Sequence, residues 1–334
     1  MIKFLVNAEN IRCSVRHSME DNMVLPEDVR QKINQFFEGQ TKSLLRETRE
    51  KLTHKYKTNQ AVNKSVFDTK QDSSVYAISR MPATFAVLYR LISGLITQQK
   101  IENVSSIIDI GSGTGAGFFA CRELFSAKIS LFERDSNMIE VFNQFETGAT
   151  PKKFDLIRDS LDEKADLVMS SYVFSELSEE GRVTGLKKML DASNRYVLIV
   201  DTGTPRTYEN FMKLKNMAYD LGFQVTAPCE TQKCGLKNDY CQFYARVERS
   251  SLMKLAKDAE LSYEDEKYFY LLIDKQTGDL GVSGEQRIIY RPKITGNFVE
   301  LKLCTKDGVL IKNVTKKDKE LYKKARKINI NELL

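Results

Sequence analysis

The chain has 334 residues, of which 42% are hydrophobic, and it carries a formal net charge of +6. This size allows one large core with one or two appended modules. No run of about eighteen apolar residues is present, so no membrane-spanning helix is predicted. The N-terminus lacks the apolar core of a secretory signal. The six cysteines are therefore expected to be thiols or metal ligands in a reducing compartment, and not disulfides.

The first hundred residues are predicted to be mainly helical. Residues 27–58 repeat apolar side chains at helical spacing, which predicts one or two amphipathic helices. The polar residues 59–73 are predicted to be a loop. A second helical region follows, with Pro82 near a helix start.

From residue 106 onward the pattern alternates between strand and helix. The predicted strands are 106–110, 128–132, 154–157, 166–170, 195–200 and one beginning at 222; the predicted helices are 115–125, 135–145, 179–192 and 207–221. This alternation predicts a doubly wound α/β domain with a parallel sheet and helices on both faces.

After residue 226 the composition changes to cysteines, basic residues and short β-rich runs. Strands are predicted within 266–274, 288–290, 298–303 and 309–311, followed by a basic helix over 317–327. The expected organisation is a helical region 1–75, an α/β domain 76–226, and a small cysteine-rich, basic, β-rich module 227–334.

The glycine cluster after the strand 106–110 indicates a ligand site. Asp109 stands two residues before the first glycine of Gly111-Ser112-Gly113-Thr114-Gly115. A carboxylate there would repel the pyrophosphate of a dinucleotide, which such turns otherwise hold. S-adenosylmethionine has no phosphate, and its ammonium and sulfonium groups would be attracted. The pattern predicts a Rossmann-like fold that binds this methyl donor; the alternative is a generic nucleotide-type fold whose glycines serve only a tight turn.

A second acid supports this site. Glu133 ends the next predicted strand, where a carboxylate can accept hydrogen bonds from a ribose diol. The residues predicted to bind the donor are Asp109, Gly111, Ser112, Gly113, Gly115, Glu133, Asp159 and Ser170.

Four cysteines suggest a soft-metal site. Cys229, Cys234 and Cys241 lie within thirteen residues, and Cys304 sits on a later strand that could return beside them. Their C-x4-C-x6-C spacing differs from the C-x2-C pairs of zinc ribbons, which favours an iron–sulfur cluster of the 4Fe-4S type over zinc. Zinc and buried free thiols remain the alternatives. Cys13 and Cys121 are interpreted as ordinary small apolar residues.

The basic C-terminal region suggests a polyanionic partner. Residues 309–334 hold eight Lys or Arg and three acids. Such a region beside a neutral core is typical of a protein that brings a small-molecule site to RNA; the alternative is a solvated helix. The predicted RNA-binding residues are Arg287, Arg291, Lys293, Lys316, Lys317, Lys323, Lys324, Arg326 and Lys327.

No catalytic residue is predicted. Only two histidines are present, and neither is placed to act as a base. The loop after the strand 166–170 reads Ser171-Tyr172-Val173, without the Asp/Asn-Pro-Pro-aromatic sequence used for amine methylation or a nucleophilic cysteine. Whether the chain transfers a methyl group therefore stays open.

The chain resembles a family, the methyltransferase-like assembly factors of the small ribosomal subunit, known from mitochondria and with compact bacterial relatives. The resemblance runs from about residue 70 to the C-terminus. It rests on Tyr76-x3-Arg80-x-Pro82-Ala83, the turn after Asp109, Ser170 to Leu177, Asp201-Thr-Gly-Thr-Pro205, Ala227-Pro228-Cys229, Asp239-Tyr240-Cys241, Glu264 to Lys267, Leu303-Cys304 and Tyr322-x2-Ala325-Arg326. It departs where the family has a histidine after its first and third cluster cysteines.

The resemblance implies an S-adenosylmethionine-type fold, an iron–sulfur site on the four cysteines, and binding to small-subunit rRNA or a pre-subunit during assembly. We expect an S-adenosylmethionine methyltransferase-like protein that binds small-subunit rRNA and acts in small-subunit assembly or translation, with methyl transfer left open. An active rRNA methyltransferase is the alternative, and a small-molecule methyltransferase is a third. The protein is expected to be a monomer off the ribosome. The expected location is the cytoplasm of a bacterial-type cell, with the mitochondrial matrix as the alternative.

Overall fold

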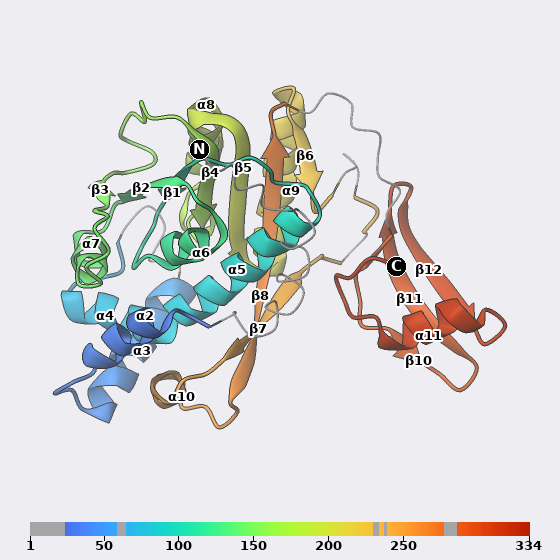
Figure 1. The fold of residues 1–334 in the computed structure, drawn as a ribbon, viewed down its shortest axis with the longest axis horizontal. Coiled ribbons are helices and arrows are strands. Elements are labelled where there is room, and N and C mark those ends of the chain that lie inside the picture. Colours follow the sequence, from blue (N-terminus) through green and yellow to red (C-terminus); the bar gives the residue numbers. More distant parts are fainter. Residues whose placement is uncertain (1–23, 59–64, 230–233, 237–238, 277–285) are drawn as a thin grey trace, which may run out of the picture. The chain divides into compact units, whose positions relative to one another are not determined.

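The computed structural model describes residues 24–58, 65–229, 234–236, 239–276 and 286–334 (Figure 1). Their contacts form two compact units: Met1–Ser160 with Ala245–Glu266, and Leu161–Tyr244 with Lys267–Leu334. These units differ from the expected boundaries after residues 75 and 226. The first unit combines the N-terminal helices with the glycine turn, and the second contains the four candidate metal-binding cysteines.

The N-terminal helices are α2 (Glu27–Gln35), α3 (Lys42–Lys57), α4 (Lys70–Ser79) and α5 (Met81–Thr97). The prediction of helix over 27–58 is confirmed as two helices. The predicted loop over 59–73 ends too late, because Thr69 and Asp72 form a reciprocal capping box that starts α4 at Lys70. Pro82 lies in the first turn of α5, as expected. In the part of the chain that the structure describes, no helix is long and apolar enough to cross a membrane.

Three parallel strands of the first unit carry the glycine turn, and their order is β3-β2-β1. The elements are β1 (Ser106–Ile110), α6 (Ala116–Leu124), β2 (Lys128–Glu133), α7 (Ser136–Asn143) and β3 (Lys152–Lys153). The strand predicted over 154–157 is wrong. The Asp155 carboxylate accepts hydrogen bonds from the amides of Ile157 and Arg158, which turns the chain there and ends β3 earlier.

The second unit contains a mixed set of strands. Its elements are β4 (Ala165–Ser171), the short 3-10 helix η1 (Phe174–Glu176), α8 (Glu179–Ala192), β5 (Ser193–Thr202), α9 (Pro205–Asp220) and β6 (Gln224–Ala227). β4 and β5 are parallel. β8 (Tyr263–Asp274) lies between β5 and β6 and is antiparallel to both. The predicted parallel pairing is confirmed for the pairs β1–β2, β2–β3 and β4–β5, whereas the antiparallel insertion of β8, whose long apolar end fills this buried position, was not predicted.

Two elements before β8 were not predicted. β7 (Phe243–Glu248) pairs with β8, and α10 (Ser251–Lys257) connects them. Val247 and Met253 pack with Ala83 and Ala86 of α5 in a small apolar cluster. Glu264 forms an ion pair with Arg249, at an N–O separation of 2.9 Å, and another with Lys257. These two ion pairs hold the ends of the connection together.

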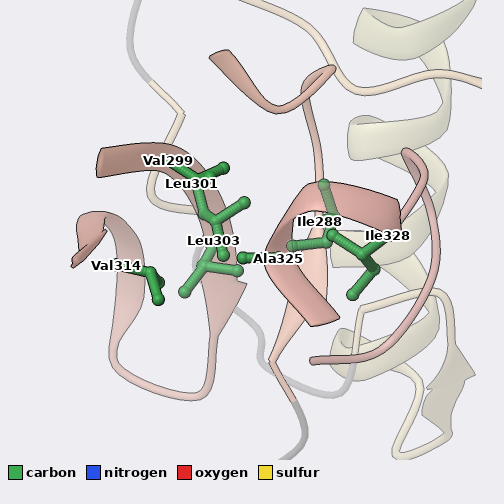
Figure 2. Packing of buried hydrophobic residues seen from close by; sticks show 7 residues of the cluster. All are labelled: Ile288, Val299, Leu301, Leu303, Val314, Ala325 and Ile328. Atoms are coloured by element: carbon green, nitrogen blue, oxygen red, sulfur yellow. The ribbon is translucent and has the colours of Figure 1, made fainter. Parts of the chain in front are cut away.

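A second, antiparallel sheet lies near the C-terminus. It consists of β9 (Arg287–Ile288), β10 (Lys293–Ile294), β11 (Phe298–Thr305) and β12 (Gly308–Thr315), followed by α11 (Lys319–Lys327). Figure 2 shows Leu303 of β11 and Ala325 of α11 pointing toward one another within the cluster that joins helix and sheet. The predicted β-rich character and terminal basic helix are confirmed.

Candidate functional site

A tight glycine turn joins the end of β1 to the start of α6. Gly111, Gly113 and Gly115 have φ angles of 72°, 54° and 97°, which glycine adopts without the steric cost that a Cβ brings. A Cβ at Gly115 would lie 2.5 Å from the Phe142 ring, so packing against α7 requires this glycine. A Cβ at Gly113 would meet nothing closer than 4.0 Å, which leaves that part of the turn open to a ligand.

Asp109 lies on β1 immediately beneath the turn. Its side chain is 1% exposed, and neither carboxylate oxygen has a hydrogen-bond partner among the described residues. A Cβ at Gly117 would lie only 2.4 Å from Oδ2, so the carboxylate packs directly against α6. Burial, with a smaller contribution from the charge of Glu133, raises the pKa of Asp109 to about 7. An ionised Asp109 is thus costly until a cation lies beside it.

Glu133 ends β2 and links that strand to the turn. One carboxylate oxygen accepts the Gly113 amide and the other accepts the Asp135 amide, each at 2.7 Å. Burial raises the pKa of Glu133, and these two backbone bonds oppose the rise. The two acids predicted from the sequence therefore lie at the same turn. The predicted ribose contact of Glu133 stays a prediction, since its oxygens can accept further hydrogen bonds.

The other predicted donor-binding residues lie in different settings. The Ser112 hydroxyl is buried in the turn with no partner in the described chain. Asp159 is exposed after β3, where its carboxylate accepts the Asp155 amide at 2.7 Å. Ser170 belongs to the second unit, near the end of β4; it is fully buried, and its hydroxyl also lacks a partner among the described residues.

Two of the candidate metal ligands lie around Arg287 of the second unit. In the register of the small sheet, Cys304 on β11 lies opposite Arg287 on β9. The Arg287 guanidinium donates a hydrogen bond from Nη1 to Cys241 Sγ at 3.4 Å. Cys241 and Cys304, which are 63 residues apart in sequence, are therefore brought to the same arginine.

Cys234 approaches the same region through the residue that follows it. A Cβ at Gly235 would lie 2.6 Å from the Val309 nitrogen on β12. Val309 is the register partner of Cys304. The close approach of Gly235 to β12 thus places the neighbouring Cys234 near the strand pair that carries Cys304.

Cys229 follows β6 and completes the group. Burial raises the pKa of its thiol to about 12; Arg287 and Lys215 oppose this rise, while Cys241 and Cys304 add to it. Cys229 therefore shares its electrostatic surroundings with Arg287, Cys241 and Cys304. None of the described cysteines forms a disulfide.

The thiols do not form a closed metal geometry. Among the residues that the structure describes, no group of three or more Cys, His, Asp or Glu side chains is arranged to hold a metal ion. Of the other cysteines, Cys121 is buried in α6 and Cys13 lies outside the described residues. The structure therefore gathers four thiols but does not show the predicted iron–sulfur or zinc site.

Sequence reasoning missed three residues around these thiols. Tyr208 shares a hydrogen bond of 3.1 Å with Cys234 Sγ. Lys215, 1% exposed on α9, is electrostatically coupled to Cys229 and Cys304. The signal for Lys215 was present in the sequence, because it follows Phe211 by four residues and so falls on the buried stripe of its helix. Arg287 was predicted to bind RNA, but the structure buries it against the Cys241 thiol.

The predicted RNA-binding residues divide into two groups. Arg287 is 9% exposed and engaged with Cys241, so its guanidinium is not presented to RNA phosphates. We therefore remove it from the RNA-binding set. The others are exposed, and Ala325, with 0% exposure, anchors α11 so that its basic side chains project from the sheet. The exposed residues are Arg291, Lys293, Lys316, Lys317, Lys323, Lys324, Arg326 and Lys327.

Solved structures of methyltransferases resemble the fold. The plantazolicin methyltransferase BpumL, in complex with SAH, is 16% identical with a TM-score of 0.43, covering 69% of this chain and 99% of that one. Magnesium protoporphyrin IX methyltransferase (ChlM) from Synechocystis PCC 6803 is 11% identical with a TM-score of 0.40, covering 70% of this chain and 99% of that one. Neither likeness is close enough to transfer a site residue.

A comparison with curated proteins finds no match. The comparison with protein families does find one, over residues 70–333. This stretch contains the glycine turn, the four gathered thiols and the basic terminal helix, and it accounts for most of the 334 residues. The chain therefore belongs to the family described as mitochondrial small ribosomal subunit Rsm22.

Proposed function

We propose that this protein binds S-adenosylmethionine at the glycine turn and serves as a factor of the small ribosomal subunit, with rRNA as its partner. The observation that carries the donor site is the buried Asp109 carboxylate, whose oxygens lack hydrogen-bond partners among the described residues. Such a group needs a positive charge beside it. S-adenosylmethionine offers an ammonium and a sulfonium, whereas a dinucleotide would bring a pyrophosphate of the wrong sign.

The residues of the turn have separate roles in this proposal. Asp109 attracts the cationic part of the donor, and Glu133 accepts hydrogen bonds from its ribose while keeping the Gly113 amide in place. The open face of Gly113 permits close approach, and the Ser112 hydroxyl supplies a free donor and acceptor. Asp159 completes the proposed set within the first unit, and the donor contact of Ser170, which belongs to the second unit, stays a prediction from the sequence. When bound, S-adenosylmethionine supplies an electrophilic methyl group.

We assign no base or nucleophile for methyl transfer. The proposal is therefore a donor-binding assembly factor, and the alternative is an active rRNA methyltransferase. Both need a surface for RNA, which the exposed lysines of α11 supply. A small-molecule methyltransferase would have no use for that surface, so this third reading is less consistent with the structure.

We further propose a 4Fe-4S cluster held by Cys229, Cys234, Cys241 and Cys304, with zinc as the alternative. Thiolates are the ligands both groups require. The region suits several negative charges, because the positive charges of Arg287 and Lys215 already act on these thiols. The described residues contain no group of three or more ligands arranged around a single metal ion, so metal or cluster content has to be measured directly.

Partner and location follow from the family. Its description names the mitochondrial small ribosomal subunit, which supports small-subunit rRNA or a pre-subunit as the partner. It also favours the mitochondrial matrix over the cytoplasmic location expected from the sequence. We propose that the protein is a monomer when it is not bound to the subunit.

Two measurements test the proposal. Titration calorimetry of the folded full chain should detect S-adenosylmethionine binding, and Asp109→Ala should weaken it about tenfold or more, since charge-assisted hydrogen bonds contribute roughly 1.5–3 kcal/mol. The absence of binding to folded protein would refute the donor site. Ultraviolet cross-linking in cells should recover small-subunit rRNA, and a map without small-subunit rRNA would refute the assigned partner.

A further inference from the structure

Arg287 is a buried cation whose surroundings are unusual. It is 9% exposed, its guanidinium lies over the Phe243 ring with 4.6 Å to the centroid, and it donates to Cys241 Sγ. Within the described ranges, no carboxylate forms an ion pair with it. A buried charge is costly unless an opposite charge compensates it. The sulfur atoms are the groups placed to do so.

The sheet register fixes the arginine among the thiols. Arg287 and Cys304 are opposite one another on adjacent antiparallel strands, and the same guanidinium donates to Cys241 Sγ. Four thiolates around a 4Fe-4S cluster in its 2+ state, or around a zinc ion, carry two net negative charges. The buried Arg287 cation would offset one of them.

We propose that Arg287 is a positioning residue of the thiolate site, which orients the Cys241 sulfur and offsets part of the charge of the metal-bound thiolates. This inference rests on the proposed metal site. It gives Arg287 a role distinct from that of the exposed Arg291 and Lys293, which remain available to RNA. Hydrogen bonds to ligand sulfurs and buried charge also set the affinity and reduction potential of such sites.

Cobalt(II) is a suitable probe, because thiolate-to-cobalt charge-transfer absorption reports directly on sulfur ligation. Full-length protein would be titrated anaerobically with cobalt alone. Arg287→Met, which keeps much of the side-chain volume but removes the charge, should lower cobalt affinity about tenfold or more, in the range typical of residues that orient metal ligands. Arg287→Lys should recover most of the loss. The exposed Arg291→Gln is the matched control and should bind as the unmodified protein does.

The stability of the metal-free protein provides a second readout. Arg287→Met should weaken cobalt binding but should not lower this stability. Without bound metal, the buried Arg287 charge faces a thiol and the Phe243 ring but forms no ion pair with a carboxylate in the described ranges. Arg287→Met should therefore unfold in urea at the same or a higher midpoint than the unmodified protein. A purely structural arginine would instead lower that midpoint and leave cobalt affinity unchanged.

The outcomes separate this inference from the proposed site. Equal cobalt affinity in folded Arg287→Met and unmodified protein overturns the role of Arg287 and leaves the metal site standing. An unmodified protein that shows no charge-transfer band and, after anaerobic purification, contains no iron, sulfide or zinc overturns both. If Arg287→Met does not fold, Arg287→Lys decides: an affinity within a few fold of the unmodified protein supports charge compensation, and a loss of tenfold or more in folded protein rejects it.

Discussion

The buried carboxylate of Asp109 leads to a prediction about pH and stability. Its pKa rises from 3.8 to about 7 on folding, mainly because of burial. Each pKa unit corresponds to 1.36 kcal/mol, so ionised Asp109 costs roughly 4 kcal/mol of folding free energy. Asp109→Asn keeps the shape and removes the charge. It should therefore stabilise the ligand-free protein by up to about 4 kcal/mol at pH 8.

The size of the effect depends on pH in a defined window. Below pH 3.8 the carboxyl is protonated in both the folded and the unfolded protein, so Asp109 lowers stability no more than asparagine would. Between about pH 4 and pH 7 the unfolded protein ionises while the folded protein stays protonated, so the stability of the unmodified protein falls relative to the variant. Above about pH 7 the folded protein ionises as well, and the fall stops. The difference in unfolding free energy should thus grow between about pH 4 and pH 7 and then level off.

Urea unfolding of both proteins across this range measures the difference directly. Asp201→Asn is a matched control: Asp201 is also fully buried, with a raised pKa, at the end of β5. Its carboxylate, however, accepts the Ser175 and Thr202 amides, each at 2.7 Å. An amide side chain offers one acceptor oxygen for two donors, so Asp201→Asn should destabilise the protein.

Binding of S-adenosylmethionine should reduce the stability advantage of Asp109→Asn. The donor's cations compensate the ionised carboxylate, so saturating donor should raise the stability of the unmodified protein more than that of Asp109→Asn. The reasoning fails if Asp109→Asn is no more stable than the unmodified protein at pH 8, or if its advantage is equally large at pH 4.

Three further predictions follow from individual contacts. Gly117→Ala should lower the unfolding free energy by about 1–3 kcal/mol, measured by thermal unfolding, because its Cβ would lie 2.4 Å from Asp109 Oδ2. Gly94→Ala in α5 is the control: its Cβ would have nothing within 4 Å, so this variant should be neutral or stabilising in the same assay. Four exposed basic residues of α11 would be replaced with glutamine: Lys323, Lys324, Arg326 and Lys327. The replacement should weaken rRNA binding and flatten its dependence on salt concentration. An unchanged salt slope would place the RNA surface elsewhere. Substitution suits this test better than deletion of the C-terminus, because Ala325 and Ile328 belong to the core of the small sheet. Cys304→Ser should lose iron and sulfide from anaerobically purified protein, and retained metal would show that the fourth ligand is wrongly chosen.

Local periodicity explains which parts of the fold could be predicted. β1 and α8 begin and end at the predicted residues. Contiguous residues specify both elements: an apolar strand between turn signals in one case, and an amphipathic helix with a serine cap in the other. The position of β8 was not predictable in this way. Its apolar residues would fit a buried strand of either direction. The antiparallel direction is set only by its pairing with β5 and β6, which lie far away in the sequence.

The donor site was easier to predict than the surroundings of the thiols for a related reason. Asp109, Gly111 and Gly113 lie within five residues, so a strand and a turn suffice to bring them together. The thiol region draws on α9, β9 and β11, whose approach depends on tertiary packing. Four cysteines could be singled out by residue type, but nothing in their spacing indicates which cations face them.

The basic segment that begins at Arg287 shows how residue type alone leaves function ambiguous. In one continuous strand, Arg287 and Arg291 would share a face, since side chains alternate with a period of two. β9 ends at Ile288, however, so the alternation does not extend to Arg291. Pairing with Cys304 buries Arg287, while Arg291 stays exposed. A single short segment therefore carries a buried cation beside the thiols and, four residues later, an exposed cation. Substitutions at the two positions should affect metal binding and RNA binding separately.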